Sequence, residues 1–295
     1  MKIRKLFILL LAMTFGAAIG DEPAPAKDPA ARPARQISPE LRAALEKLKL
    51  PGVKINLEEW CVDVDSRVCL KEGLLELIAC TKDTKEHESI IVVDAKPSHV
   101  HTALLLIGAK PGSPAQQQAI DPEMTRYRSI PPSGSPVDVF LVFKNPEGKQ
   151  VEKPISDFIK RSDEQEQPTE PDAEDDNGKF PTHTFLFAGS ILVGEGDGPR
   201  RYLCDSEGNV ISISTFGDEL LCLPGFHEQA NGALMWQVNG EKLPELDSKI
   251  ILRLRPSDGI SRRSLRLIRR LTKIRRENDG FTRWALYLSR HVHPS

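Results

Sequence analysis

The stretch "KEHESIIVVDAKPSHVHTALLLIG", residues 85–108, decides the fold class. Its β-branched run Ser89–Ala95 predicts a buried strand, because short apolar runs bounded by turn signals are typical of strands. Ser98 can cap a helix over about residues 98–107, which Gly108 ends. A strand followed directly by a short helix predicts a domain that combines sheet and helix.

Similar short apolar or β-branched runs occur along most of the chain. They cover residues 53–57, 61–66, 74–80, 137–145, 183–193, 200–204, 209–216, 219–224, 233–239 and 249–256. Residues 110–136, which are rich in Pro, Gly and Gln, predict a loop, and Asp205–Asn209 predicts a hairpin turn. We therefore expect an α+β fold, dominated by a mostly antiparallel or mixed sheet, with one prominent helix and a helical C-terminal tail.

The N-terminus has the pattern of a secretory signal. Lys2, Arg4 and Lys5 precede the apolar run Leu6–Ile19, and small residues stand at positions 18–20. This pattern predicts a signal peptide over 1–20 and export to the periplasm or the extracellular space. An uncleaved N-terminal anchor is the alternative, although the run is short for a membrane span. The Pro- and Ala-rich residues 21–37 predict a mobile spacer.

The rest of the chain divides by composition into a body, 38–256, and a tail, 257–295. Within the body, residues 162–178 carry eight acids and no base, which predicts a disordered, solvated loop. A calcium loop is the alternative interpretation, but Asn177 stands where its glycine should be and no acid occupies the twelfth position.

Charge is distributed unevenly. The formal charge is −2; subtracting the +3 of residues 1–20 and the +8 of residues 261–295 leaves −13 for 21–260. An acidic body argues against nucleic-acid binding by this part of the chain. The tail predicts amphipathic helix, with eight Arg or Lys and no acid in 262–276, and residues 261–295 could contact a membrane surface or an acidic partner. A poorly ordered extension, or a tail from a shifted reading frame, is the alternative.

Five cysteines are candidates for disulfides if the chain is exported. They are Cys61, Cys69, Cys80, Cys204 and Cys222. Their pairing cannot be deduced from spacing, and the odd number leaves at least one unpaired. No C-x-x-C occurs, so the ligand pattern of an iron–sulfur cluster or a zinc ribbon is missing.

Histidines give the sharpest candidates for chemistry. A polar cluster of His87, Glu88, Ser89 and His101 is either a functional site or a structural network. A divalent metal would need further ligands, for which His99 and His183 are the other candidates. If 87–89 is strand, His87 and Ser89 share a face and Glu88 points away. Helical geometry places His101 on the face of Leu104 and Leu105, which favours a partly buried, hydrogen-bonded ring.

The segment "VCLKEGLLELIACTKDTKEHESIIVVDAKPSHVHTALLLIGAKPG" resembles the YdjY-like domain of exported bacterial proteins. Gly189-Ser190, "GNVISISTFGDELLCLP" at 208–224 and a final strand that ends "LRP" resemble the same family in the same order. The resemblance implies no defined activity. It includes "HES" and His101 among the family's distinctive residues, and leaves the tail as an addition.

Together these features favour an exported cell-envelope protein, most simply a non-catalytic domain that binds a ligand or a partner. One alternative is a metal-dependent envelope enzyme that uses His87, Glu88 and His101. Another is a membrane-surface assembly protein anchored by its basic tail. The cofactor, the ligand and the partner are unknown at this level.

Overall fold

The computed structural model describes residues 45, 47–121, 123, 126–162, 180, 182–194, 198, 200–227, 229 and 234–257. All of them belong to the second of two compact units, Ile37–Ser295. The signal segment 1–20, the spacer 21–37 and almost all of the acidic segment 162–178 and the tail 257–295 lie outside the described residues. The predictions made for those segments therefore stay predictions.

Short strands dominate the described chain. They are β1 (Val53–Asn56), β2 (Cys61–Val68), β3 (Leu77–Thr81), β4 (Ser89–Val93), β5 (Gln116–Ala119), β6 (Tyr127–Ile130), β7 (Pro136–Lys144), β8 (Gln150–Pro154), β9 (Ile159–Arg161), β10 (Thr184–Leu186), β11 (Leu192–Val193), β12 (Arg201–Tyr202), β13 (Asn209–Ser212), β14 (Leu221–Cys222), β15 (Trp236–Val238) and β16 (Lys249–Pro256). The helices are α2 (Pro97–Leu106) and α3 (Cys204–Glu207), with 3-10 turns η1 (Glu86–Glu88), η2 (Ile155–Phe158) and η4 (Gly240–Lys242).

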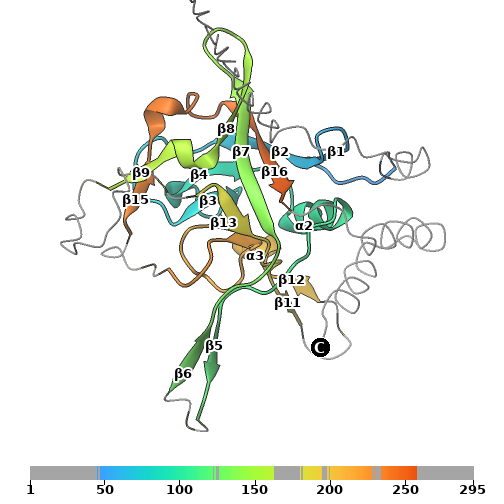
Figure 1. The fold of residues 1–295 in the computed structure, drawn as a ribbon, viewed down its shortest axis with the longest axis vertical. Coiled ribbons are helices and arrows are strands. Elements are labelled where there is room, and N and C mark those ends of the chain that lie inside the picture. Colours follow the sequence, from blue (N-terminus) through green and yellow to red (C-terminus); the bar gives the residue numbers. More distant parts are fainter. Residues whose placement is uncertain are drawn as a thin grey trace, which may run out of the picture. The chain divides into compact units, whose positions relative to one another are not determined.

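The main sheet closes into a barrel (Figure 1). Its strand order is β1-β2-β16-β7-β10-β14-β13-β3-β4, and an additional pairing of β2 with β4 closes the ring from β2 to β4, with β1 and β8 outside it. The pairs β3–β4 and β13–β14 are parallel, and the other pairs are antiparallel. The expected α+β fold with a β-dominated, mixed sheet is confirmed.

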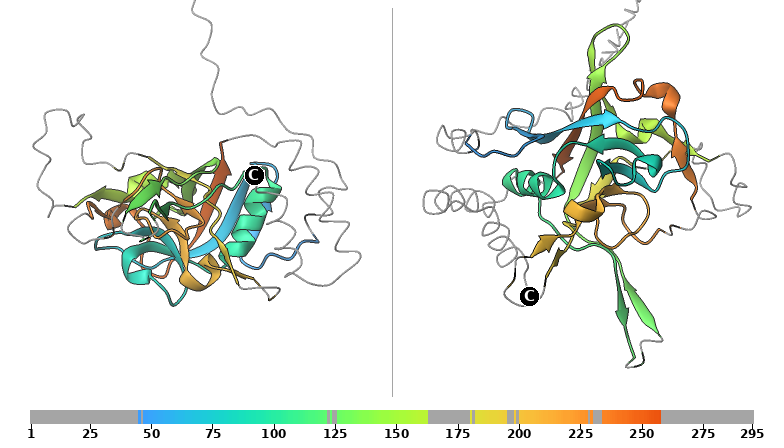
Figure 2. Two further views of the ribbon diagram at one scale, coloured as in Figure 1. Left: turned by 90° about the horizontal axis from the view of Figure 1, so that it is seen from below. Right: turned by 180° about the vertical axis from the view of Figure 1, so that it is seen from behind.

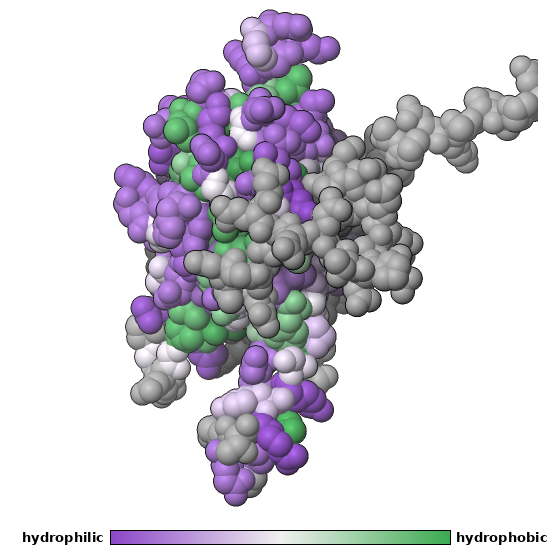
Figure 3. Space-filling model, turned by 90° about the vertical axis from the view of Figure 1, so that its left-hand side faces the viewer, coloured by the Kyte–Doolittle hydropathy of each residue, from purple (hydrophilic) through white to green (hydrophobic). Residues whose placement is uncertain are grey.

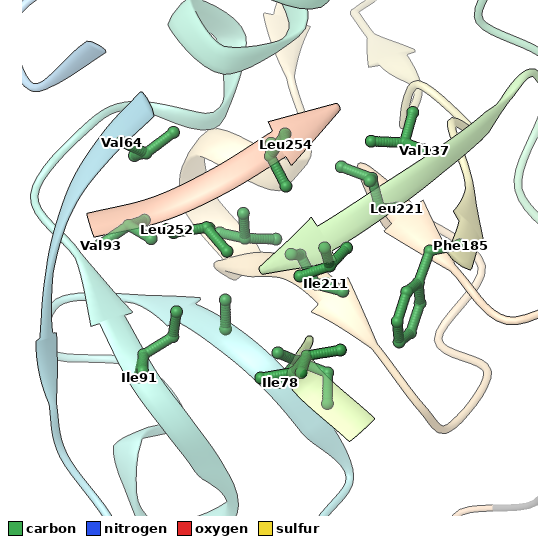
Figure 4. Packing of buried hydrophobic residues seen from close by; sticks show 14 of the residues in the cluster. Val64, Ile78, Ile91, Val93, Val137, Phe185, Ile211, Leu221, Leu252 and Leu254 are labelled. Atoms are coloured by element: carbon green, nitrogen blue, oxygen red, sulfur yellow. The ribbon is translucent and has the colours of Figure 1, made fainter. Parts of the chain in front are cut away.

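Buried apolar side chains fill the barrel interior (Figure 4), and in the long strands β2, β7 and β16 they are mostly alternate residues. Leu252 and Leu254 of β16 and Val137 of β7 are fully buried there, together with Ile78 of β3 and Phe185 of β10. Because successive side chains point to opposite faces, a period of two in the sequence selects these residues for the inside. Burial of such side chains contributes about 1.5–3 kcal/mol each.

The start of α2 differs from the prediction, because Ser98 bonds to another element and does not cap its own helix. Lys96 is the N-cap and Ser98 makes no capping bond within its own helix. Instead, the Asp205 carboxylate accepts hydrogen bonds from Ser98 N and Oγ at 2.8 and 2.7 Å. Asp205 lies in α3, which Gly208 ends with φ +81°, so the predicted hairpin turn is wrong. No helix in the described part of the chain is long and apolar enough to cross a membrane.

The segment predicted as a loop, 110–136, contains a β-hairpin. Its strands β5 and β6 pair antiparallel, with Gln117 opposite Ser129 and Ala119 opposite Tyr127. The hairpin projects from the barrel in Figure 1 and in the right-hand view of Figure 2. Its surface is mostly hydrophilic where it extends at the lower end of the space-filling view (Figure 3). A polar hairpin lacks the alternation that marks a half-buried strand, which is why the sequence did not predict it.

The outer face of the barrel carries an ion-pair group that we call the Arg253 cluster. Its members are Arg253, Arg255, Glu59, Asp63 and Glu152. Arg253 lies directly opposite Asp63 across β16 and β2, and its Nε and Nη2 donate to both Asp63 carboxylate oxygens at 2.7 and 2.8 Å. Its Nη1 donates to Glu59 and Glu152. Every charge that this cluster buries is therefore paired.

Candidate functional site

The segment 82–88 connects two parallel strands. Because β3 and β4 run in the same direction, this connection must return from the end of β3 to the start of β4. It begins with a turn at Asp83, whose φ is +61°, and the Glu86 carboxylate accepts hydrogen bonds from Asp83 N and Thr84 N. The turn η1 completes the connection and leads directly into Ser89. Local hydrogen bonds therefore fix the backbone that carries His87 and Glu88.

His87 and Glu88 lie near the surface, and they are 3-10 turn rather than strand, so the predicted strand alternation for 87–89 is wrong. Their side chains are 78% and 20% exposed, and His87 Nε2 lies 3.7 Å from Glu88 Oε2. Burial, and next the nearby Glu88 charge, raise the pKa of Glu76. His87 and Glu88 form a small polar group at the start of β4.

Ser89 differs from these two neighbours because it is fully buried. Its Oγ has no hydrogen-bond partner among the described residues, and its carbonyl oxygen accepts from the Cys69 thiol at 3.2 Å. Ser89 is in register with Leu77 of β3, which is in register with Ser212 of β13, and Ser212 Oγ is also buried without a partner. Buried polar atoms without partners are rare. Two of them in one row across three strands therefore make this part of the barrel a candidate site.

Two thiols lie beside Ser89, and we call Cys69, Cys80 and Ser89 the thiol cluster. Cys80 is buried with Leu77 and Val92, and the half-buried Cys69 packs against this group. The neighbouring Cys69 thiol lowers the pKa of Cys80 to about 7, burial opposes this, and the Ser89 hydroxyl acts in the same direction as Cys69. The influence of Cys80, together with burial, raises the pKa of Cys69. The pair therefore holds a proton on Cys69 and favours a thiolate on Cys80.

The neighbouring loop adds a chain of polar contacts. Lys85 Nζ lies 4.2 Å from the centre of the Phe216 ring and donates to Asn209 Oδ1 at 2.5 Å. Asn209 Nδ2 donates to Asp218 Oδ1 at 2.5 Å. Burial raises the pKa of Asp218 despite this bond.

Glu219 stands next to Asp218 and is almost fully buried. Its Oε1 accepts from the backbone N–H of Phe216 and of Gly217, while its Oε2 has no partner among the described residues. Burial raises the pKa of Glu219.

His101 belongs to a different group, on α2. Its Nδ1 lies 2.8 Å from Tyr202 Oη, and that hydroxyl donates to Gly189 O at 2.8 Å. Because Tyr202 gives its proton to Gly189, His101 Nδ1 is the donor to the tyrosine oxygen. The imidazole also meets the Phe187 ring edge-on at 4.8 Å. Gly189 has φ +86°, and a Cβ there would lie 2.8 Å from Pro111 Cβ, so this group is closely packed.

The other candidate histidines have separate surroundings. His99 Nδ1 lies 3.5 Å from Pro51 O, and the His183 ring lies 5.3 Å from the Phe140 ring. Within the described ranges, no group of three or more His, Cys, Asp or Glu is arranged to hold a metal ion. A metal-dependent activity at His87, Glu88 and His101 thus stays a prediction that no described contact supports.

All five cysteines are free thiols in the structure. Burial raises the pKa of Cys61, with the Asp63 charge, to about 12. Burial likewise raises the pKa of Cys222 to about 12, and raises that of Cys204. Only Cys80 has a lowered pKa. All five cysteines were candidates from the sequence. The pair Cys69 and Cys80 could not be singled out, because the two residues lie on opposite sides of β4.

The fold and these groups define a closed, mixed β-barrel domain with a projecting hairpin and a buried thiol cluster. The YdjY domain family matches residues 53–255, which is more than half of the chain, and the chain belongs to this family. The predicted resemblance is confirmed. No curated protein and no solved structure matches the chain.

Proposed function

We propose that this chain is an exported YdjY-domain protein whose role is to bind a partner protein in the cell envelope, without catalysis, through the β5–β6 hairpin. The signal-like residues 1–20 support the export. The observation that carries the binding role is the hairpin itself, which leaves the barrel and exposes Tyr127 and Ile120, 53% and 52% accessible.

Both outer edges of the hairpin are available for a further strand. Ile120 N donates to Arg126 O at 3.0 Å, so this pair is hydrogen-bonded across the hairpin. Because such pairs alternate with non-bonded ones, the N–H groups of Gln117, Ala119, Tyr127 and Ser129 point outward. Neither strand pairs with another strand among the described residues.

An extended segment of a partner protein fits this surface best. A two-stranded hairpin is marginally stable alone in water, and a third strand would add backbone hydrogen bonds along its edge. The side chains near the edges include an aromatic residue and several amides, which supply apolar contact and hydrogen bonding without a strong net charge. No enzymatic step is needed for this role.

Photo-crosslinking in cells tests this role. A photoreactive phenylalanine analogue at Tyr127 should give a discrete crosslinked product in the envelope fraction, whereas the analogue at Lys149, beside the turn of the β7–β8 hairpin, should not. The Ser129→Pro variant removes an outward N–H and should abolish the product, while Ser129→Ala keeps the N–H and should retain it.

Three results would contradict the proposal. Equal products from positions 127 and 149 would show non-specific contact. A product that consists of two copies of this chain would assign the hairpin to self-association. Retention of residues 1–20 with the protein in the cytoplasmic fraction would contradict export.

A further inference from the structure

We propose that residues 262–276 of the tail bind, as an amphipathic helix, to the outer face of α2 in the same chain. We call the side of α2 that carries His99, Thr102 and Leu106 its outer face. This surface is separate from the β5–β6 hairpin, and the inference does not rest on the proposed binding role.

The helix α2 is apolar on more sides than the barrel covers. It lies on the outside of the barrel and packs against β1, β2 and α3 (Figure 1). Val100, Ala103, Leu104 and Ile107 have the spacing of one helical face, and all four belong to the main hydrophobic core. The apolar run 103–107 turns through a full circle at about 100° per residue. Part of this run must therefore point away from the core.

The outer face is buried although it lies away from the core. Thr102 and Leu106 are one turn apart on this face, and they are only 2% and 3% exposed. Leu106 nevertheless belongs to neither of the hydrophobic clusters that the described residues form. A helix that is apolar all round is buried all round, so the outer face needs a covering segment besides the barrel.

The described chain ends close to the C-terminal end of α2. Ser257 N donates to Pro136 O at 3.1 Å. The preceding residue, Ser135, is bonded to Lys110, which follows shortly after α2: Ser135 N donates to Lys110 O at 2.9 Å, and Lys110 N donates to Ser135 Oγ at 2.8 Å. Residues 258–261 can extend about 13 Å, so the basic segment starts within reach of this end of the helix.

The segment before β1 approaches the opposite end of α2. Pro51 O lies 3.5 Å from Nδ1 of His99, in the first turn of the helix. Leu106 is in the last turn, about 10 Å further along the helix axis. The tail is therefore better placed than the N-terminal segment to cover Leu106.

The basic segment matches the outer face in polarity and its surroundings in charge. On a helix, Leu267, Leu271 and Ile274 line one side, and the other positions include eight Arg or Lys and no acid. A segment that runs back along α2 passes the exposed acids Asp205 and Glu207 of α3, which contacts α2. Bases are also favourable beside the C-terminal end of a helix, where the macrodipole is negative.

Photo-crosslinking within the purified full chain tests this contact. A photoreactive diazirine amino acid replaces Leu106, and the monomeric product is digested with glutamyl endopeptidase. Cleavage after Glu88, Glu123, Glu245 and Glu277 places α2 in peptide 89–123 and the basic segment in peptide 246–277. We expect these two peptides to be joined, with the attachment within 262–276. The same amino acid at Lys149 should give no such product.

Two adjacent substitutions in the tail provide the matched comparison. Leu271→Glu puts a charge on the apolar side of the segment and should abolish the crosslink from position 106. Thr272→Glu makes the same change of charge beside the apolar side and should retain it. The diazirine amino acid at Thr102, on the same face of α2, gives the same answer if the variant at 106 does not fold.

Four results would overturn the proposal. Attachment to residues 41–46 would assign the outer face to the N-terminal segment. A product of two chains would assign it to self-association. Equal yields from the Leu271→Glu and Thr272→Glu variants would show that the apolar side of the tail is not involved. Absence of the crosslink, together with binding of the parent to vesicles of phosphatidylcholine and phosphatidylserine, would assign the tail to a membrane surface.

Discussion

The Arg253 cluster and the thiol cluster both bury polar groups against the same barrel, but they satisfy them differently. Arg253 is 7% exposed, and its guanidinium donates to three carboxylates. Around the thiol cluster, Ser89 Oγ, Ser212 Oγ and Glu219 Oε2 have no partners among the described residues. Fully paired buried groups stabilise one structure, whereas unpaired buried groups are candidates for chemistry or binding. The first cluster is therefore structural, and the second is the better candidate for reactivity.

The largest effect should come from breaking the paired cluster. Arg253→Ala leaves Asp63, Glu59 and Glu152 without their shared cation, and loss of one partner from a buried ion-pair group costs about 3–5 kcal/mol. We expect the free energy of unfolding in urea to fall by about 3 kcal/mol, because parts of this cluster reach solvent. The exposed Arg201 is the control, and Arg201→Ala should change it by about 0.5 kcal/mol or less. Equal effects of the two substitutions would show that the Arg253 cluster has no special structural role.

Two buried serines sharpen the comparison. Ser66 Oγ donates to Val64 O at 3.0 Å, and Ser89 Oγ has no partner among the described residues. Ser66→Ala should lower the free energy of unfolding by about 1 kcal/mol, whereas Ser89→Ala should leave it unchanged or raise it. Thermal and urea unfolding of both variants check this. A loss of about 1 kcal/mol or more at Ser89 would show that its hydroxyl has a structural partner.

Two glutamates should respond to pH in opposite ways. Burial alone would raise the pKa of Glu152, but hydrogen bonds from Arg255 and Arg253 lower it below 4.5. The ionised form of Glu152 therefore stabilises the fold. This stabilisation is lost as pH falls through the pKa of the folded protein. Burial raises the pKa of Glu219 above 4.5, so its ionised form opposes folding until pH falls below the unfolded value.

We therefore expect Glu152→Gln to be less stable, and Glu219→Gln more stable, than the parent at about pH 8, each by about 1 kcal/mol or less. Both differences should shrink towards about pH 4, and urea midpoints across this range measure them. Differences of the same sign for the two variants would contradict the assignment of their environments.

The sequence indicated much of the barrel but little of its long-range pairing. The β-branched run before α2 and the run 137–145 predicted strands because short-range composition determines them. The contact of β2 with β4, which closes the barrel, joins residues such as Ser66 and Val93 that no local pattern relates. The same holds for Asp205, which bonds to Ser98 from another element.

The candidate site shows the same limit. "HES" was identified from its residues, and His101 was expected to be partly buried with a hydrogen-bonded ring, which its contact with Tyr202 shows. Tyr202 itself has no signal in the sequence that relates it to His101. The meeting of Cys69 with Cys80 depends on both lying beside β4, so spacing alone could not reveal it. Candidate residues could be identified from the sequence, but which of them lie close together depends on the topology of the barrel.

The most direct test of the contrast is the alkylation rate of each cysteine in the folded full chain, followed by mass spectrometry from about pH 5 to about pH 9. We expect Cys80 to react faster than the other buried cysteines, with a rate that rises through a midpoint at about pH 7, and Cys69, whose pKa is raised, to show no such midpoint. Cys61, Cys204 and Cys222 should stay unmodified across this range, because burial raises their pKa values. Equal rates at all five cysteines, or a midpoint above about pH 8.5, the value of an ordinary thiol, would contradict it.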